Sequence, residues 1–173
     1  MNKSLTLLIF IVITFSCSNE EIVEDEYTGP SAIAYDVHTN YTEKGSAKIK
    51  LDSPIQLEFE EGDKEFPEGI FLRMYKAAYG EKPYADLKAD FAHYYSKKGH
   101  WKLIGNVIYR DIENSEVLKT EEIYWSPKTH KLWTEAFVHI SAPNKELMGE
   151  GLEAKDDFSS YKIKKPRGRK QNI

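Results

Sequence analysis

The chain has few of the features that mark an enzyme or a disulfide-stabilised protein. Cys17 is the only cysteine among its 173 residues, so no disulfide can form within the chain and packing must stabilise it. The formal net charge is −4 with acidic and basic residues intermixed, which gives no general reason to expect nucleic acid as a partner. Neither a nucleophile motif nor a glycine-rich phosphate loop occurs, so the sequence favours no enzyme class that such motifs identify.

The histidines and the adjacent carboxylates of the sequence predict neither a metal site nor a catalytic pair. The five histidines are scattered, without the spacing that a zinc site uses: His38, His93, His100, His130 and His139. Two of them, His100 and His130, occupy matching places in predicted turns, which is typical of surface histidines. The pairs 121–122 and 156–157 are adjacent carboxylates, and neighbouring side chains of a strand point to opposite faces. We therefore expect a binding or transport module, not an enzyme, without catalytic residues, metal or cofactor.

What is present is a β unit that occurs twice. Residues 88–96 and 101–109 predict two strands around a polar turn, and residues 119–126 and 132–140 repeat the pattern at an offset of about 30 residues. A third, shorter copy covers residues 146–154. Because a hairpin alone cannot bury its apolar face, such units must stack on a shared core.

The earlier part of the chain also predicts strands. Residues 33–39 and 47–51 alternate, residues 52–54 end the second strand, and residues 55–59 and 70–75 predict two more. The alanines of residues 85–95 could indicate a helix, but the repeat favours a strand. With aromatic residues at 13% of the chain, these signals predict an all-β sandwich, roll or barrel.

The N-terminus predicts a targeting segment. Residues 1–16 combine Lys3 with an apolar run that is too short to span a bilayer. The segment 14–17, ending in Cys17, resembles a bacterial lipobox, in which the cysteine receives a diacylglyceryl group. An ordinary secretory signal or an uncleaved anchor is the alternative. Residues 17–31 predict a tether that follows the lipidated cysteine.

The two ends frame one folded domain. We expect it to span residues 32–163, and the basic residues 164–173, with proline and glycine, predict a disordered tail. That tail is either a solvated end or a contact for anionic headgroups.

Several segments in order carry a family resemblance: 41–49, 65–70, 103–107, 118–125, 132–134 and 148–154. Together they resemble the lipopolysaccharide-export family LptC, in a lipoprotein form. The resemblance implies an open β-jellyroll of stacked antiparallel strands, as in the related LptA and OstA proteins, with a V-shaped apolar slot. It also implies a periplasmic protein that accepts lipopolysaccharide from an inner-membrane ABC transporter and passes it, edge to edge, to an LptA-like bridge protein. Lipidation of Cys17 would anchor it, most simply in the inner membrane, in place of the family's transmembrane helix.

The residues that line the slot can be predicted once it is known which alternate residues of each strand face inward. Both Leu118 and Ile123 point inward only if a bulge lies between Thr120 and Ile123. The predicted lipid-binding residues are Leu103, Val107, Leu118, Ile123, Trp125, Leu132, Val138, Ile140 and Leu152. The alternative is that they fill a closed core. Glycine within a strand marks a bulge or a close approach, and Gly149 and Gly151 are therefore predicted at the partner-docking edge.

Two alternative hypotheses for the function remain open. One is a soluble bridge-type lipopolysaccharide carrier with the same fold, against which a lipidated Cys17 argues. The other is a surface-exposed β-sandwich lipoprotein that binds glycan or acts as an adhesin.

Overall fold

The computed structural model describes residues 27–43, 45–76 and 82–168, and the regular structure of these residues is entirely β. The all-β prediction is confirmed. The strands are β1 (Ala32–Glu43), β2 (Ser46–Glu58), β3 (Lys64–Phe66), β4 (Ile70–Tyr75), β5 (Pro83–Ala89), β6 (Phe91–Tyr95), β7 (His100–Asp111), β8 (Glu116–Ser126), β9 (Lys131–Ala142), β10 (Lys145–Lys155) and β11 (Tyr161–Arg167).

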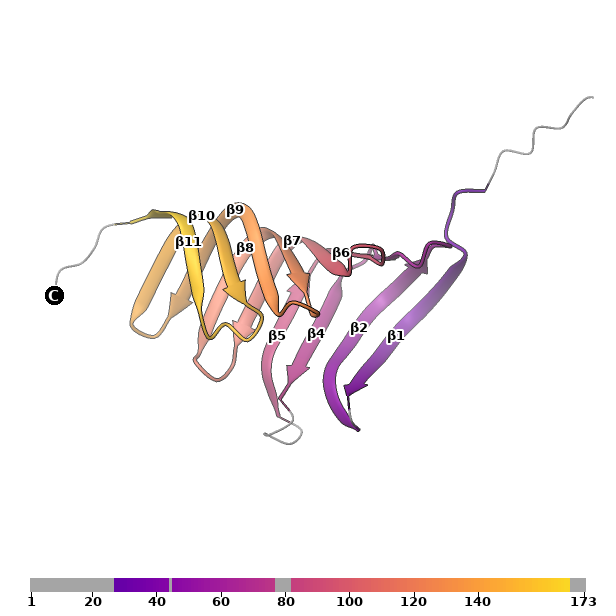
Figure 1. Cartoon of the computed structure of the whole chain (residues 1–173), viewed down its shortest axis with the longest axis horizontal. Helices are drawn as coiled ribbons and strands as arrows, with labels where there is room; N and C mark the ends of the chain where they lie inside the picture. The colour runs from indigo at the N-terminus through magenta and orange to yellow at the C-terminus, as the bar shows by residue number, and fades with distance from the viewer. Residues whose placement is uncertain (1–26, 44, 77–81, 169–173) are drawn as a thin grey trace, which may run out of the picture.

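These strands form one antiparallel sheet that folds over on itself. Its order is β11-β10-β9-β8-β7-β5-β4-β2-β3-β6, with β1 on β2 and a second pairing of β6 with β7. In Figure 1 the strands lie side by side from β1 at one end to β11 at the other. Two long strands each serve two neighbours: β7 pairs β6 through its first half and β5 through its second, and β2 pairs β4 and then β3.

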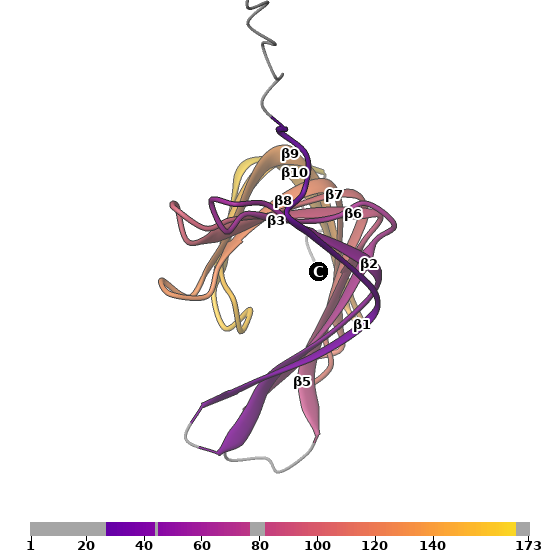
Figure 2. The ribbon, with the colours of Figure 1, turned by 90° about the vertical axis from the view of Figure 1, so that its right-hand side faces the viewer.

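The double pairing divides the sheet into two layers around one interior. Layer A contains β4, β5 and residues 107–111, 116–120, 138–142 and 145–149 of β7 to β10. Layer B contains β3, β6, residues 100–104, 122–126, 131–134 and 152–155 of the same four strands, and the start of β11. Seen end-on in Figure 2, the ribbon is an open curve whose two layers meet along one side.

The bend between the layers is built from short polar residues and glycine. Gly105 and Asn106 on β7 have φ of 77° and 45°. The backbone N–H of Asp90, between β5 and β6, donates to the carbonyl of Gly105 (3.0 Å), and its carboxylate accepts from Nδ2 of Asn106 (2.6 Å). A Cβ on Gly105 would lie 3.1 Å from Asp90, so this corner has little room for a side chain. The predicted single strand 88–96 is therefore wrong in one respect: it breaks at Asp90.

On β8, the alternation of inward-facing and outward-facing residues shifts by one, as the sequence predicted. Leu118 and Ile123 are both fully buried, and the register shifts on both sides of β8 fall between Thr120 and the residues just after it. The third copy of the repeat repeats the shift, because β10 changes register between Glu150 and Leu152, where Gly151 has φ of +74°. The predicted bulge is confirmed, and the register shifts lie where β7 to β10 pass from layer A to layer B.

Cross-strand rows of apolar side chains fill the interior. One row runs through layer A and continues onto β2 and β1. It crosses eight strands in register and consists of Thr39, Leu51, Leu72, Leu87, Tyr109, Leu118, Ile140 and Leu147. In layer B, Phe66, Ala92, Leu103 and Ile123 form a matching row. Except for the two ends of the first row, these residues are at least nine-tenths buried. Period-2 alternation on every strand thus forms one continuous core.

Two other predictions about the N-terminal half are wrong. Residues 52–54 do not end a strand, since β2 runs through Pro54 to Glu58. Proline is tolerated there because the pairing with β4 stops at Asp52 and that with β3 begins at Leu57, so the missing N–H costs no ladder bond. Residues 60–64, mostly charged, are typical of a loop, but Lys64 already begins the short strand β3, which the sequence did not predict.

The predicted tail is partly a strand. Lys164 to Arg167 belong to β11, which pairs with β10 as far as Met148 and Arg167. Their positive charges face carboxylates: Lys164 contacts Glu135 and Glu153, and Arg167 contacts Glu150. Opposing charges across the ladder therefore override a composition that is typical of disorder. Residues 169–173 lie outside the described residues.

Candidate functional site

The nine predicted lipid-binding residues meet in one interior. Layer A contributes Val107, Leu118, Val138 and Ile140, and layer B contributes Leu103, Ile123, Trp125, Leu132 and Leu152. All nine belong to a single apolar cluster, and none is more than 2% exposed. In this part of the molecule the interior is a packed core, so lipid contact at these residues remains a prediction that requires the layers to separate locally.

The opposite end of the roll is open, and sequence reasoning did not identify its residues as part of the site. On β1, Ile33, Tyr35 and Tyr41 are 51%, 71% and 63% exposed. Their cross-strand partners on β2 are apolar. One of these partners, Ile49 opposite Tyr41, packs against the interior cluster. Among the described residues β1 pairs only with β2, so the inward face of this hairpin continues the core without a layer covering it.

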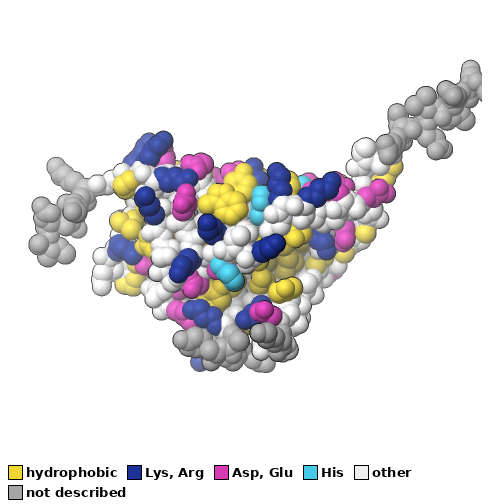
Figure 3. Space-filling model, viewed as in Figure 1, with side chains coloured by type: hydrophobic (Ala, Val, Ile, Leu, Met, Phe, Trp, Pro, Cys, Tyr) yellow, Lys and Arg dark blue, Asp and Glu magenta, His cyan; other side chains and the backbone are white. Residues whose placement is uncertain are grey.

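One face of the molecule carries mixed charge. Lys, Arg, Asp and Glu side chains are interspersed over the face shown in Figure 3, and hydrophobic side chains show between them over β2, β4 and β5. His100, predicted as a surface residue, is half-buried and packs edge-on against Tyr124 and Trp133 at 5.9 and 5.6 Å. Burial, together with the charge of Lys98, lowers the pKa of His100.

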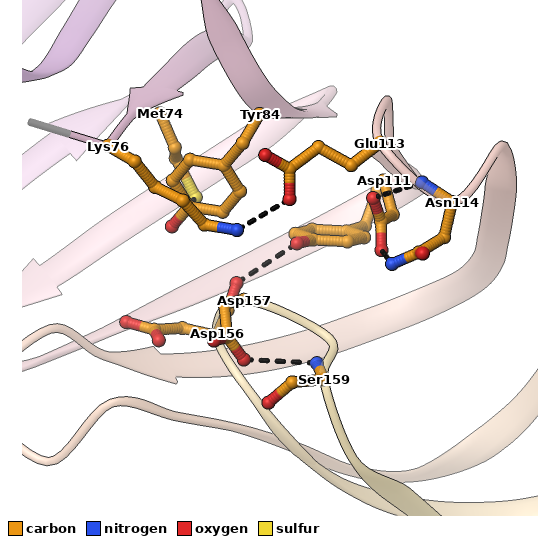
Figure 4. A network of polar contacts seen from close by, with 10 residues as sticks. Met74, Lys76, Tyr84, Asp111, Glu113, Asn114, Asp156, Asp157 and Ser159 are labelled. Carbon is orange, nitrogen blue, oxygen red and sulfur yellow. Dashed lines mark hydrogen bonds and ion pairs between the residues drawn. The ribbon is translucent and has the colours of Figure 1, made fainter. Parts of the chain in front are cut away.

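One turn bridges the two layers of the interior. Between β10 and β11, residues 156–160, here called the closing turn, reach from layer B to layer A. Phe158 is 4% exposed and its ring lies between those of Tyr109 (4.9 Å) and Tyr161 (4.8 Å). The Tyr109 hydroxyl, on layer A, donates to the carbonyl oxygen of Asp156 at 3.0 Å (Figure 4). The turn therefore ties the two layers together at the mouth of the V.

Polar contacts hold the closing turn in shape. The N–H of Asp156 donates to the carbonyl of His130 (3.2 Å), and its carboxylate lies 3.1 Å from Nδ1 of the same histidine. The Asp157 carboxylate accepts from the N–H of Ser159 at 3.0 Å (Figure 4). Burial alone would raise the pKa of Asp157, but the hydrogen bonds of Ser159 outweigh it and lower that pKa.

The phenols beneath the closing turn are neutral: that of Tyr109 is buried and that of Tyr84 partly buried. Tyr84 lies on β5 beside Met74, with its hydroxyl 3.7 Å from the sulfur, and Lys76 contacts Glu113 nearby at 2.5 Å (Figure 4). Burial, reinforced by the surrounding carboxylates, raises the pKa of both Tyr84 and Tyr109. These groups carry no charge at neutral pH, so they suit an apolar interior better than a reaction centre.

The two glycines that were predicted near the partner-docking edge lie one strand away from an edge of the described sheet. Gly149 and Gly151 lie on β10, which pairs with β9 on one side and β11 on the other. A Cβ on Gly149 would lie 2.5 Å from Cγ2 of Ile163 and closer still to the carbonyl oxygen of Lys165, and one on Gly151 would meet the side chain of Lys164. These glycines accommodate β11, and β11 is the edge strand within the described part of the chain.

The predicted anchor cannot be placed. Cys17, with the signal segment 1–16 and most of the tether 17–31, lies outside the described residues. Within residues 27–43, 45–76 and 82–168, no helix is long and apolar enough to cross a membrane. The same residues contain no group of three or more histidine, cysteine or acidic side chains that could hold a metal ion.

An antiparallel sheet folded into two layers around an apolar interior, open at one end, is a β-jellyroll of the open type. A family model described as lipopolysaccharide-assembly, LptC-related, matches residues 4–166. The chain therefore belongs to this LptC-related family, and it is a periplasmic component of lipopolysaccharide transport. The match extends into β11, almost to its end. A search of curated proteins finds no match.

Proposed function

We propose that this protein is a lipid-anchored component of the lipopolysaccharide export machinery. It accepts lipopolysaccharide from the inner-membrane ABC transporter and passes it to a periplasmic bridge protein. The observation that carries the proposal is the continuity of the interior, whose longest row runs in register from exposed Thr39 on β1 to Leu147 on β10. Such a surface can hold acyl chains while sugars and phosphates stay in water.

Lipid enters at the open end of the roll. The exposed Ile33, Tyr35 and Tyr41 offer apolar surface that needs no rearrangement before contact. Each methylene that moves from water onto such a surface contributes about 0.8 kcal/mol. Farther along, the closing turn lies across the mouth of the V. We propose that Phe158 leaves its place between Tyr109 and Tyr161 when acyl chains pass.

The two end strands serve as docking edges. Within the described chain β1 pairs only with β2 and β11 only with β10, so each presents backbone donors and acceptors that another strand can use. We assign β11 to the bridge protein and β1 to the transporter. Lys162, Lys164 and Pro166 on β11 limit unspecific pairing, since charged residues and proline are the usual protection of an edge.

The anchor is the proposed diacylglyceryl group on Cys17. A single acyl chain holds a protein only marginally on a membrane, whereas several chains anchor it stably. Residues 17–31 then span the distance from the bilayer to β1, which places the open end of the roll nearest the transporter. Membrane fractionation with protease treatment of whole cells separates this arrangement from the surface-exposed adhesin: the proposal requires inner-membrane, protease-protected protein.

Native mass spectrometry of the purified full-length chain tests the lipid assignment. Lipopolysaccharide should bind saturably, at one molecule per chain, and should displace phospholipid. A variant with Tyr35→Ser and Tyr41→Ser, which removes two exposed rings from the open end, should bind more weakly. Equal binding of both lipids, or no binding of either, would contradict the proposal.

A further inference from the structure

Trp125 contains a buried polar atom whose hydrogen-bonding capacity is unused. Its side chain faces the interior of layer B and is 2% exposed. The indole Nε1 nevertheless has no hydrogen-bond partner among the described residues. Leaving a buried donor unpaired costs about 1–3 kcal/mol, so such an atom in a native structure calls for an explanation.

The neighbours of Trp125 offer no acceptor. Its cross-strand partners in layer B are Trp101 on β7 and Leu132 on β9, and Leu132 is followed by Ala154 on β10. The Trp101 ring lies 6.3 Å away with an interplanar angle of 29°. Because an indole N–H lies in the plane of its own ring, it does not point at the face of a ring stacked on it. The cross-strand neighbours of Trp125 are thus aliphatic or aromatic, and none of them gives the donor a partner.

The position of Trp125 along β8 indicates which kind of acceptor could pair with its indole N–H. Trp125 is the last residue but one of β8, next to the turn 127–130, whereas Ile123 and Leu103 lie deeper toward the bend. A lipid in the slot with its headgroup at the mouth would place its methylenes against the deeper residues. The ester or amide carbonyl, where each acyl chain joins the headgroup, would then lie at the level of Trp125. Indole suits such a boundary, since it combines an apolar body with one donor.

Resting on the proposed function, we infer that the Trp125 indole N–H donates a hydrogen bond to the ester or amide carbonyl of an acyl chain held in the slot. The ring packs against the chain while the N–H selects for the carbonyl. Trp125 is thus a specificity-determining residue: it favours acylated lipids over ether-linked lipids with alkyl chains of equal length, which lack the carbonyl.

The test compares two lipids that differ only in that group. Full-length protein is titrated with a diacyl phosphatidylglycerol, with its dialkyl ether analogue and with lipopolysaccharide, and binding is followed by native mass spectrometry. A net hydrogen bond of about 1–1.4 kcal/mol predicts about five- to tenfold tighter binding of the ester lipid. Trp125→Phe should abolish this preference and weaken lipopolysaccharide binding by a similar factor. Trp101→Phe, which shortens the ring next to it but leaves the donor, should keep the preference.

A spectroscopic measurement locates the bond independently of affinity. In protein labelled with ¹⁵N-tryptophan, the indole signal of Trp125 is the one that Trp125→Phe removes. The ester lipid should shift this N–H signal downfield and slow its exchange with water, and the ether lipid should not. An ester preference that survives Trp125→Phe, or an unshifted indole signal in the bound state, would overturn the inference. Absence of binding by the unaltered protein would instead overturn the proposed function.

Discussion

Tyr109 and Phe158 join the two layers of the roll, with ring centroids 4.9 Å apart and planes inclined by 25°. Tyr109 belongs to β7 in layer A, and Phe158 to the closing turn that extends from layer B. Phe158 also has φ of 57°, a backbone conformation that is costly for an aromatic residue. A strained residue held by a ring stack is the natural place for the interior to open.

Phe158→Ala should therefore destabilise the protein and expose its interior. Removing a buried phenylalanine costs about 3 kcal/mol, and urea unfolding measures the loss. The dye ANS should bind the variant under native conditions, because the apolar core loses its cover. Phe137→Ala is the control, since that ring is 47% exposed and its removal should change stability by no more than about 0.5 kcal/mol. Equal losses of stability in the two variants would contradict the proposed role of the closing turn as a cover of the interior.

Gly149→Ala should loosen β11 specifically. The new Cβ would press on the carbonyl of Lys165 and on Ile163, and overpacking of this kind costs about 1–3 kcal/mol. Hydrogen exchange should accelerate at the amides of β11 more than elsewhere. The control is Gly99→Ala, which is strained at φ of +65° but has no neighbour within 4 Å, so its comparable loss should leave β11 unchanged. Uniform acceleration in both variants would contradict the proposed role of Gly149.

Asp63 should make the free energy of unfolding depend on pH in the acidic range. Burial alone would raise the pKa of Asp63, but hydrogen bonds from the Ser96 N–H (2.8 Å) and hydroxyl (2.9 Å) and from His93 outweigh it and lower that pKa. Because the pKa is lower in the folded state, the stabilisation is complete above the unfolded value of about 3.9 and disappears as pH falls through the folded value. In urea unfolding, Asp63→Asn should lose stability at pH 6 and approach the unaltered protein at pH 3. A constant difference between the two proteins would refute this assignment, and the exposed Glu60→Gln serves as the control.

Cys17→Ala tests the anchor. If Cys17 carries the diacylglyceryl group, the substitution should abolish incorporation of a clickable fatty acid and release the protein from washed membranes. Ser16→Ala keeps a small residue before the cysteine and should preserve labelling. Undiminished labelling of the Cys17→Ala protein would eliminate the lipobox assignment.

The sequence predicted the repeated hairpins and their parity because both are local properties. An offset of 29 residues aligns Thr120 with Gly149 and Ile123 with Leu152, and the strands change register at both places. The requirement that Leu118 and Ile123 both face inward was enough to place the shift. Burial of the nine predicted residues follows from the same alternation.

The features that sequence reasoning missed depend on contacts between distant segments. The break at Asp90 exists because Gly105 and Asn106, on another strand, bond to it. The basic residues of β11 form a strand because Glu150 and Glu153 lie opposite, whereas their composition alone is typical of disorder. For the closing turn, one apolar residue among five, Phe158, was the only local signal.

Site-specific photo-crosslinking in cells tests the central claim most directly. A photoreactive phenylalanine analogue replaces Thr39, which is exposed, faces the open interior and begins the row through Leu51. The neighbouring Asn40, exposed on the outer face opposite Lys50, is the matched control. Lipopolysaccharide should crosslink at position 39 and not at position 40. Equal crosslinking at both positions, or at neither, would contradict transport of lipopolysaccharide through the interior of the roll.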